Sequence, residues 1–369
     1  MEEKTVAVIG SGIVGVTAAY YLQRAGQKTL LFDHGVGQAS KASAGIICPW
    51  FSQRRNADWY QLVADGAKFY RQLMADLTSD GVEELPFEEC GAIVFKKKRS
   101  LVQRLYEKAM ERRQSDPTMG ELAILTPEEI THTIPGFKSA YHALFASGGG
   151  KVDGARLVKI MQDQFVQQGG QFIPQKVHIK KHTDRLVSIT SESQQWDVDQ
   201  VIVAAGAFLA DVLSPLNHRV GIRPQKGQLI VCNCGESTES WPVLMLVGET
   251  DIIPDRACQV IIGASHENDK GYDLSLDQTI SNSFMEEAKS YFPDLHFEKI
   301  SERVGTRAYT EDFLPLYGDY PFCNRIKVAS GLGSSGLTSG PIIGYRLAQR
   351  ILGKEISIPE AFNPNKYID

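Results

Sequence analysis

The chain has 369 residues, of which 43% are hydrophobic and 22% are charged, with a formal net charge of −5 and a pI of about 6.0. The length suggests two domains, and the composition is typical of a globular protein. The weakly acidic net charge excludes the basic surface of a nucleic-acid-binding protein. No apolar run approaches the roughly 18 residues that span a bilayer, and the N-terminus lacks the basic region of a signal peptide.

The segment at residues 5–34 holds the most informative pattern. An apolar run at 5–9 predicts a buried parallel strand, and a glycine-rich turn, GSGIVG at 10–15, follows at once. A helical pattern comes next, and a second apolar run at 29–32 ends on Asp33. This order of strand, turn, helix, strand and acid predicts a dinucleotide site. A glycine turn that binds nothing is the alternative.

Each residue of this pattern has a physical role. Gly10 permits the tight turn, Gly12 lets the backbone approach a pyrophosphate, and Gly15 lets the helix pack against the strand. The free N–H groups of the helix N-terminus attract phosphate. Asp33 is placed to accept a hydrogen bond from a ribose hydroxyl.

The remaining elements follow in chain order. We expect helices at residues 57–77, 99–114, 155–168, 276–292 and 342–352, with a capped helix start at Thr126. We expect strands at residues 91–95, 171–174, 177–181, 186–190, 201–206, 227–232, 260–263 and 326–329. Dinucleotide-type segments lie at both ends and in the middle of the chain. They imply a discontinuous nucleotide domain at residues 1–83, 147–215 and 305–369, and a second domain at 84–146 and 216–304.

A second glycine-rich turn, GLGSSGLT at residues 331–338, separates a strand from the closing helix. It lies too late in the chain to belong to the first nucleotide unit. Reduced flavin carries negative charge near N1 and C2=O, and a helix N-terminus stabilises such charge. The turn therefore favours a flavin, with an ordinary tight loop as the alternative.

Arg307 lies in an apolar and aromatic segment, GTRAYTEDFLPLYG at 305–318. A planar guanidinium in such a place suits bidentate binding of a substrate carboxylate. A structural ion pair, for example with Asp312, is equally compatible with the spacing.

Other polar residues give weaker signals. The small residues at 40–45 either let the backbone approach a flat ring or form a flexible loop. His178 and His182 lie on a strand-like segment about 13 Å apart, too far to share a metal, so no metal site is expected. The six cysteines lack C-x-x-C spacing, and we expect reduced thiols in a cytoplasmic protein, with peripheral membrane contact left open.

Together these motifs resemble the flavin-dependent D-amino-acid oxidase family, in the branch that holds glycine oxidases, sarcosine oxidases and bacterial D-amino-acid dehydrogenases. The resemblance covers nearly the whole chain. It is carried by GSGIVG with the following acid, ASKASAGII, KVDGARLV, VIVAAGAF, RPQKGQLI, GTRAYTEDFLPLYG and GLGSSGLTSG.

The resemblance implies an α/β fold, α+β overall, with a discontinuous Rossmann-like FAD-binding domain and a second, mixed-sheet substrate domain. It implies that the cofactor is contacted by Gly10, Ser11, Gly12, Ile13, Val14, Gly15, Asp33, His34, Ser40, Lys41, Ser43, Ala44, Gly45, Ile46, Val177, Ala205, Gly206, Gly331, Gly333, Ser334, Ser335, Gly336, Leu337 and Thr338. It places Arg307 on the family's carboxylate-binding arginine. Gly305 replaces the cysteine that binds flavin covalently in sarcosine oxidases, so FAD is expected to be non-covalent.

Two further positions depart from the family pattern. Ile261 lies where sarcosine oxidases carry an oxygen-activating lysine, which counts against that activity. Asp251 lies where glycine oxidases place an aromatic substrate contact. If Asp251 faces the pocket, its carboxylate pairs with a cationic amine or a basic side chain; a surface position is the alternative.

The implied reaction is oxidation of the C–N bond of a small amino or imino acid, of D-amino-acid or glycine type, by hydride transfer from Cα to flavin N5. Arg307 fixes the substrate, and no catalytic base is assigned. Electrons then pass to oxygen or a quinone-type acceptor, and a homo-oligomer remains open. The alternatives are a 2-hydroxy-acid or glycerol-phosphate oxidoreductase, a flavoprotein electron-relay subunit and an NAD-only dehydrogenase.

Overall fold

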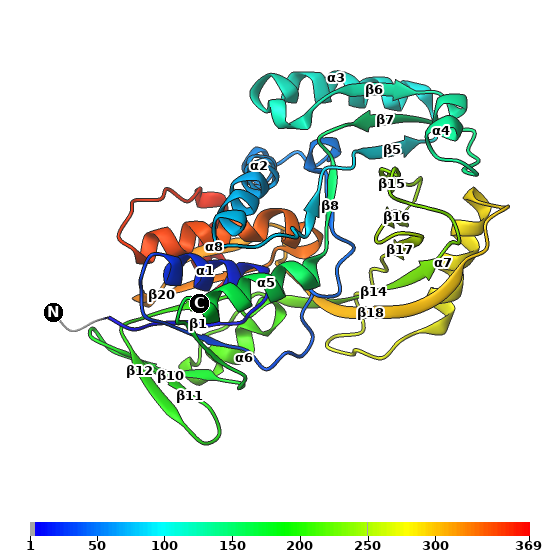
Figure 1. Ribbon diagram of the computed structural model, residues 1–369. Helices are drawn as coiled ribbons and strands as arrows, with labels where there is room; N and C mark the ends of the chain where they lie inside the picture. The colour runs from blue at the N-terminus through cyan, green and yellow to red at the C-terminus, as the bar shows by residue number, and fades with distance from the viewer. Residues whose placement is uncertain (1–3, 249) are drawn as a thin grey trace.

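The computed structural model describes residues 4–248 and 250–369 and divides most of the strands between two large sheets (Figure 1). The first sheet has six strands in the order β19-β20-β13-β1-β2-β9. Its strands are β1 (Val6–Ile9), β2 (Thr29–Phe32), β9 (Gln171–Ile173), β13 (Gln200–Val203), β19 (Leu316–Tyr320) and β20 (Cys323–Ser330). All neighbours pair in parallel except β19, which is antiparallel to β20.

The six-stranded sheet is covered on both faces, which explains its continuous apolar strands. Side chains alternate along β1, so Val6 and Val8 belong to the core on one face and Ala7 and Ile9 to the core on the other. Helices fill the first core. The small sheet formed by β10 (His178–His182), β11 (Val187–Thr190) and β12 (Gln195–Val198) contributes to the second.

The second large sheet has eight strands in the order β18-β14-β17-β16-β15-β5-β7-β6. They are β5 (Ala92–Lys96), β6 (Leu122–Leu125), β7 (His142–Ala146), β14 (Arg223–Asn233), β15 (Val243–Met245), β16 (Asp251–Pro254), β17 (Gln259–Gly263) and β18 (Glu298–Tyr309). A last small sheet comprises β3 (Ile46–Ile47), β4 (Phe87–Glu88) and β8 (Gly150–Val152). These two large sheets, one mainly parallel and one mixed, confirm the predicted fold class.

The helices connect and cover the sheets. They are α1 (Ile13–Arg24), α2 (Ala57–Ser79), α3 (Arg99–Ser115), α4 (Pro127–Thr133), α5 (Gly154–Gln167), α6 (Leu209–Leu213), α7 (Gln278–Tyr291) and α8 (Gly336–Ile351). Short 3₁₀ helices lie at Pro49–Phe51, Pro117–Met119, Gly206–Phe208, Ser214–Leu216, Gly333–Ser335, Glu360–Phe362 and Pro364–Lys366. The predicted capped start at Thr126 is confirmed as a reciprocal capping box with Glu129.

Helices α1 and α8 lie side by side above the six-stranded sheet (Figure 1). A Cβ atom at Gly344 would lie 2.3 Å from the Val14 carbonyl oxygen, and one at Gly340 would lie 2.5 Å from Ile13 Cγ2. The two glycines therefore allow a close approach that no other residue permits. Because α1 follows β1 and α8 follows β20, two parallel strands of one sheet, both helix N-termini lie at the same sheet edge.

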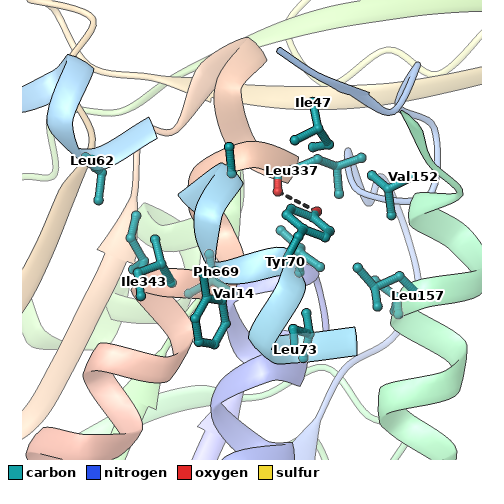
Figure 2. Close-up of a cluster of buried hydrophobic side chains, with 14 of the residues drawn as sticks. Val14, Ile47, Leu62, Phe69, Tyr70, Leu73, Val152, Leu157, Leu337 and Ile343 are labelled. Carbon is teal, nitrogen blue, oxygen red and sulfur yellow. Dashed lines mark hydrogen bonds between the residues drawn. The ribbon is translucent and has the colours of Figure 1, made fainter. Parts of the chain in front are cut away.

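Helix α8 begins at Gly336, six residues before the predicted start, with Pro341 in its interior. Proline has no N–H, so the carbonyl of Leu337, four residues earlier, lacks its helical donor. Figure 2 shows that the buried Tyr70 of α2 supplies one: its hydroxyl donates to the Leu337 carbonyl oxygen at 2.7 Å. This contact between distant segments allows the helix to extend through the proline.

The surroundings of this bond are apolar. Figure 2 shows side chains from several segments around Tyr70, among them Val14, Ile47, Leu62, Phe69, Leu73, Val152, Leu157, Leu337 and Ile343. A Cβ atom at Gly66 of α2 would lie 2.1 Å from the Thr338 carbonyl oxygen, so α2 also meets the first turn of α8 at close range. The start of α8 is thereby held against α1 and α2 together.

Strand β18 was not predicted. Its first half carries charged, mostly exposed residues, including Glu298 and Lys299, because it forms the edge of the eight-stranded sheet. It pairs with β14 from Arg223↔Tyr309 to Asn233↔Glu298. The predicted boundary between the two domains, at residue 305, lies inside this strand.

We predict that Tyr70→Phe lowers the free energy of unfolding by about 1–3 kcal/mol, because it leaves a buried carbonyl without a donor. In a Pro341→Ala background the cost should fall, since residue 341 then supplies the missing N–H. Urea denaturation of the four variants at one fixed FAD concentration measures this coupling. An equal cost of Tyr70→Phe in both backgrounds would contradict the role given to Tyr70.

Candidate functional site

A cleft of about 1000 Å³, counted out to open solvent, lies at the carboxyl ends of the parallel strands. It is lined by the two glycine-rich turns and by the segment after β2. The residues expected to bind cofactor that line it are Gly10, Gly12, Ile13, Val14, Asp33, His34, Ser40, Val177, Ala205, Gly206, Gly331, Gly333 and Gly336. Residues that are far apart in sequence therefore meet in one cleft.

A second cavity of about 890 Å³ adjoins the first. The two share Ala39, Ser40, Arg307, Gly333 and Gly336, so they form one continuous space. Of the other expected residues, the second cavity is lined by Ser43, Ala44, Gly45, Ile46, Asp251, Ser334 and Leu337. The expected residues that line neither space are Ser11, Gly15, Lys41, Ser335 and Thr338.

The first glycine turn has the geometry that its sequence predicts. Gly10 has φ +99°, and a Cβ atom there would lie 2.4 Å from the Ala204 carbonyl oxygen. At Gly15 a Cβ atom would lie 1.8 Å from the Gly10 carbonyl oxygen, so this residue serves packing rather than the cleft. Gly12 is the N-cap residue of α1, and a Cβ atom there would meet only Ser40 Oγ, at 3.4 Å. The Ile13 N–H at the start of this helix donates to Ser40 Oγ at 2.9 Å, and Gly12 adds no side-chain cap.

Asp33 ties this turn to the end of β2. Its carboxylate accepts from the Ser11 backbone N–H at 2.5 Å and from the Gly35 backbone N–H. Carboxylate oxygens accept more than one hydrogen bond each. Asp33 therefore keeps capacity for a hydroxyl group in the cleft that it lines.

Three buried polar atoms on the wall of the first cleft have neither a hydrogen-bond nor an ion-pair partner among the described residues: Gln38 Oε1, Gln175 Oε1 and Thr306 Oγ1. Buried polar groups are rarely left unpaired in folded proteins. Their position suits a ligand that is polar along much of its length.

The second glycine turn also depends on glycines with positive φ and a close contact. Gly331 and Gly333 have φ +75° and +55°, and a Cβ atom at Gly333 would lie 2.2 Å from the ring of Tyr309. The Tyr309 hydroxyl accepts from the Ser334 N–H at 3.1 Å. The turn leads directly into α8, so a second helix N-terminus meets the continuous space.

These features fit an extended dinucleotide such as FAD. Gly10 and Gly12 leave room for a pyrophosphate at the start of α1, and Asp33 can accept from a ribose hydroxyl. Gly331 to Gly336 would place backbone N–H groups beside the electron-rich edge of a flavin ring. The unpaired polar atoms on the wall give such a ligand hydrogen-bond partners.

Arg307 is held by neighbours of the eight-stranded sheet. One guanidinium nitrogen donates to Gln225 Oε1 at 3.0 Å and to the Ser265 carbonyl oxygen at 2.8 Å. The guanidinium lies on Gly227, where a Cβ atom would be 2.7 Å from Arg307 Cζ. Burial lowers the pKa of Arg307, although the phenol of Tyr309 and the carboxylate of Glu267 oppose the shift.

Within residues 4–248 and 250–369, no carboxylate lies within 4.0 Å of the Arg307 guanidinium. Asp312, the alternative structural partner, instead accepts hydrogen bonds from the hydroxyls of Thr310 and Tyr367. Arg307 thus presents a positive charge without a direct ion-pair partner to both parts of the continuous space.

Asp251 lies at the start of β16, half-buried, on the wall of the second cavity. Burial raises the pKa of its carboxyl group to about 7; the Leu246 N–H and the charge of Lys96 oppose this, and Glu287 reinforces it. His266 also lines the second cavity.

Gln225, Gly227 and Ser265 were missed as site residues. Gly227 carried a readable signal, since a glycine inside a strand often marks a close approach. Gln225 and Ser265 carried none, because they reach Arg307 only through the pairing of β14 with β18 and through the segment after β17.

No helix in the described part of the chain is both long and apolar enough to cross a membrane. The same residues contain no group of three or more His, Cys, Asp or Glu side chains able to hold a metal ion.

Comparison with protein families agrees with this geometry. The family model described as FAD dependent oxidoreductase (DAO) matches residues 5–350. The uncharacterized oxidoreductase YurR of Bacillus subtilis is 33% identical over 359 residues, covering 96% of this chain and 96% of that protein.

Two solved structures share the fold over nearly the whole chain. The iminodiacetate oxidase IdaA from Chelativorans sp. BNC1 has a TM-score of 0.91 at 29% identity and covers 97% of this chain and 98% of its own. The glycine oxidase of Geobacillus kaustophilus has a TM-score of 0.87 at 18% identity and covers 99% and 100%.

We predict that Gly227→Ala weakens binding of a simple carboxylate such as acetate by about tenfold or more, because the new Cβ displaces the guanidinium and charge-assisted hydrogen bonds are lost. Calorimetric titration measures the change. Gly221→Ala is the matched control, since its Cβ would meet Tyr367 only at ordinary contact distance, 3.4 Å. Unchanged acetate affinity in Gly227→Ala would contradict the packing of the Arg307 guanidinium against Gly227.

Proposed function

We propose that this chain, which belongs to the DAO family of FAD dependent oxidoreductases, oxidises the carbon–nitrogen bond of a small amino or imino acid. The family membership rests on the match over residues 5–350. The choice of substrate rests on the second cavity and on the residues that line it.

The observation that carries the proposal is the state of Arg307. Its guanidinium is half-buried and packs against Gly227, is oriented by Gln225 and Ser265, and has no carboxylate partner in the described chain. A buried charge without a partner is costly unless a ligand compensates it. A planar guanidinium binds a carboxylate through two parallel hydrogen bonds, so an amino-acid carboxylate suits it.

The chain's own residues would then act by positioning. Arg307 would fix the substrate carboxylate and thereby restrict how the carbon bearing the amine is presented, which lowers the entropic part of the barrier. Bound FAD would accept two electrons from the substrate. The walls formed by Gly263, Ala264, His266 and residues 42–46 would enclose the reacting carbon and limit access of water.

The names of similar proteins support this substrate class. An iminodiacetate oxidase and a glycine oxidase are named for small amino or imino acids. A glycine oxidase of Pseudomonas aeruginosa is 24% identical over 368 residues.

The test is anaerobic mixing of the purified holoprotein with D- and L-amino acids, N-substituted glycines, 2-hydroxy acids and glycerol phosphate. We expect at least one amino or imino acid to bleach the flavin absorption. If only hydroxy acids or glycerol phosphate bleach the flavin, the protein is a 2-hydroxy-acid or glycerol-phosphate oxidoreductase and the proposed reaction is wrong. The absence of bleaching by any compound would favour an electron-relay role.

We predict that Arg307→Gln raises the substrate concentration for half-maximal bleaching about thirtyfold or more, since truncating one partner of a buried charge pair typically costs at least 2 kcal/mol. Arg303→Gln is the matched control on the same strand, because Arg303 pairs with Asp255 at 3.7 Å and lines neither cavity. An equal effect of the two substitutions would remove Arg307 from the substrate site.

The acceptor of the electrons is a separate question. We propose oxygen or a quinone-type compound, and the rate of oxygen consumption with the best substrate of the panel separates the two.

A further inference from the structure

We infer that Asp251 selects substrates that carry a second, cationic group on the side chain. This assignment rests on the proposed oxidation of an amino acid whose carboxylate binds Arg307. It identifies the class of amino acid: one with a protonated amine several bonds from the carboxylate.

Asp251 and Arg307 line the same cavity and lie on the same face of the eight-stranded sheet. In the strand register Asp251 is opposite Gly263, and Gly263 is opposite Leu229. Leu229 and Gly227 are two residues apart on β14, so they share a face. The Arg307 guanidinium covers Gly227 on that face. The cavity thus holds a positive and a negative group on one wall.

The register also sets their separation. Two strand spacings, about 10 Å, separate Asp251 from β14, and the step from Leu229 to Gly227 adds about 7 Å along the strand. The diagonal distance from Asp251 to Gly227 is therefore about 12 Å.

Each end of the ligand would form a hydrogen bond of about 2.8 Å to the protein. The rest of the distance between Asp251 and Gly227 leaves room for several covalent bonds between the ligand's carboxylate and its cationic nitrogen. The amine on Cα is only two bonds from the carboxylate carbon, which is too short for this span. A side-chain amine reaches it.

The charged groups around Asp251 leave its carboxylate available to a cationic group of a ligand. Lys96 of β5 and Glu287 of α7 influence its carboxylate from a distance, and the Leu246 N–H hydrogen-bonds it. Among residues 4–248 and 250–369, no Lys or Arg nitrogen lies within 4.0 Å of this carboxylate. His266 and Arg307 are the other charged or titratable groups that share the cavity wall.

A cationic ligand would stabilise the charged form of Asp251. Because burial raises the pKa of this carboxyl group to about 7, the free protein binds a proton there at lower pH. Selectivity for a cationic side chain should therefore be full above pH 8 and fall as the pH drops through 7.

The experiment compares 2,4-diaminobutyrate with norvaline, its uncharged isostere, each as both enantiomers. The affinities are measured by calorimetric titration of the holoprotein under anaerobic conditions. Because the flavin is reduced beforehand, or the ligand reacts slowly, the affinities do not depend on turnover. At pH 8 we expect diaminobutyrate to bind about tenfold more tightly than norvaline. Asp251→Asn should abolish this preference, and Asp251→Lys should transfer it to glutamate.

The control variant is Asp294→Asn, which removes an exposed carboxylate paired with Lys138 away from both cavities. It should keep the wild-type preference. Equal affinity of the wild type for diaminobutyrate and norvaline would overturn the inference. An equal loss of both ligands in Asp251→Asn would also overturn it, since Asp251 would then bind the amine on Cα.

The same samples separate this inference from the proposed function. If norvaline bleaches the flavin but no cationic preference is found, the reaction stands and the role of Asp251 fails. If no amino acid bleaches the flavin but the preference and its loss in Asp251→Asn are found, the role of Asp251 stands and the proposed reaction fails.

Discussion

The site depends on the close approach of α1 and α8. Gly340 and Gly344 remove the side chains that would hold the two helices apart, and a Cβ at Gly344 would meet the Val14 carbonyl oxygen at 2.3 Å. Each helix follows a parallel strand of the same sheet, so both positive N-termini reach one continuous space. A single packing contact thereby brings together two turns that lie more than 300 residues apart.

A second constraint, strand β18, connects the turn before α8 with the proposed substrate-binding residue Arg307. Strand β18 starts at the exposed edge of the eight-stranded sheet and ends at Tyr309, whose hydroxyl meets the turn before α8. Arg307 lies two residues before that end and is oriented from β14 by Gln225. Arg307, the proposed carboxylate-binding residue, and the second glycine turn are therefore held in place relative to each other by one strand.

The sequence predicted those parts of the site that are local. The glycine spacing from Gly10 to Gly15 is a local pattern, and the structure has the expected positive φ at Gly10 and close contact at Gly15, although the contact at Gly10 is with Ala204 of a distant strand end. The support for Pro341 by Tyr70 and the orientation of Arg307 by Ser265 depend on segments distant in sequence, so no local pattern indicated them. The choice between Asp312 and a ligand as the partner of Arg307 likewise needed the fold.

The central claim is that one continuous space holds FAD across both glycine turns without a covalent bond. The FAD content of the purified protein, measured before and after acid denaturation, tests it most directly. One FAD per chain, fully released on denaturation, is the predicted result, because Gly305 offers no thiol for attachment. A protein without flavin, or a flavin that stays on the precipitated chain, would contradict the account.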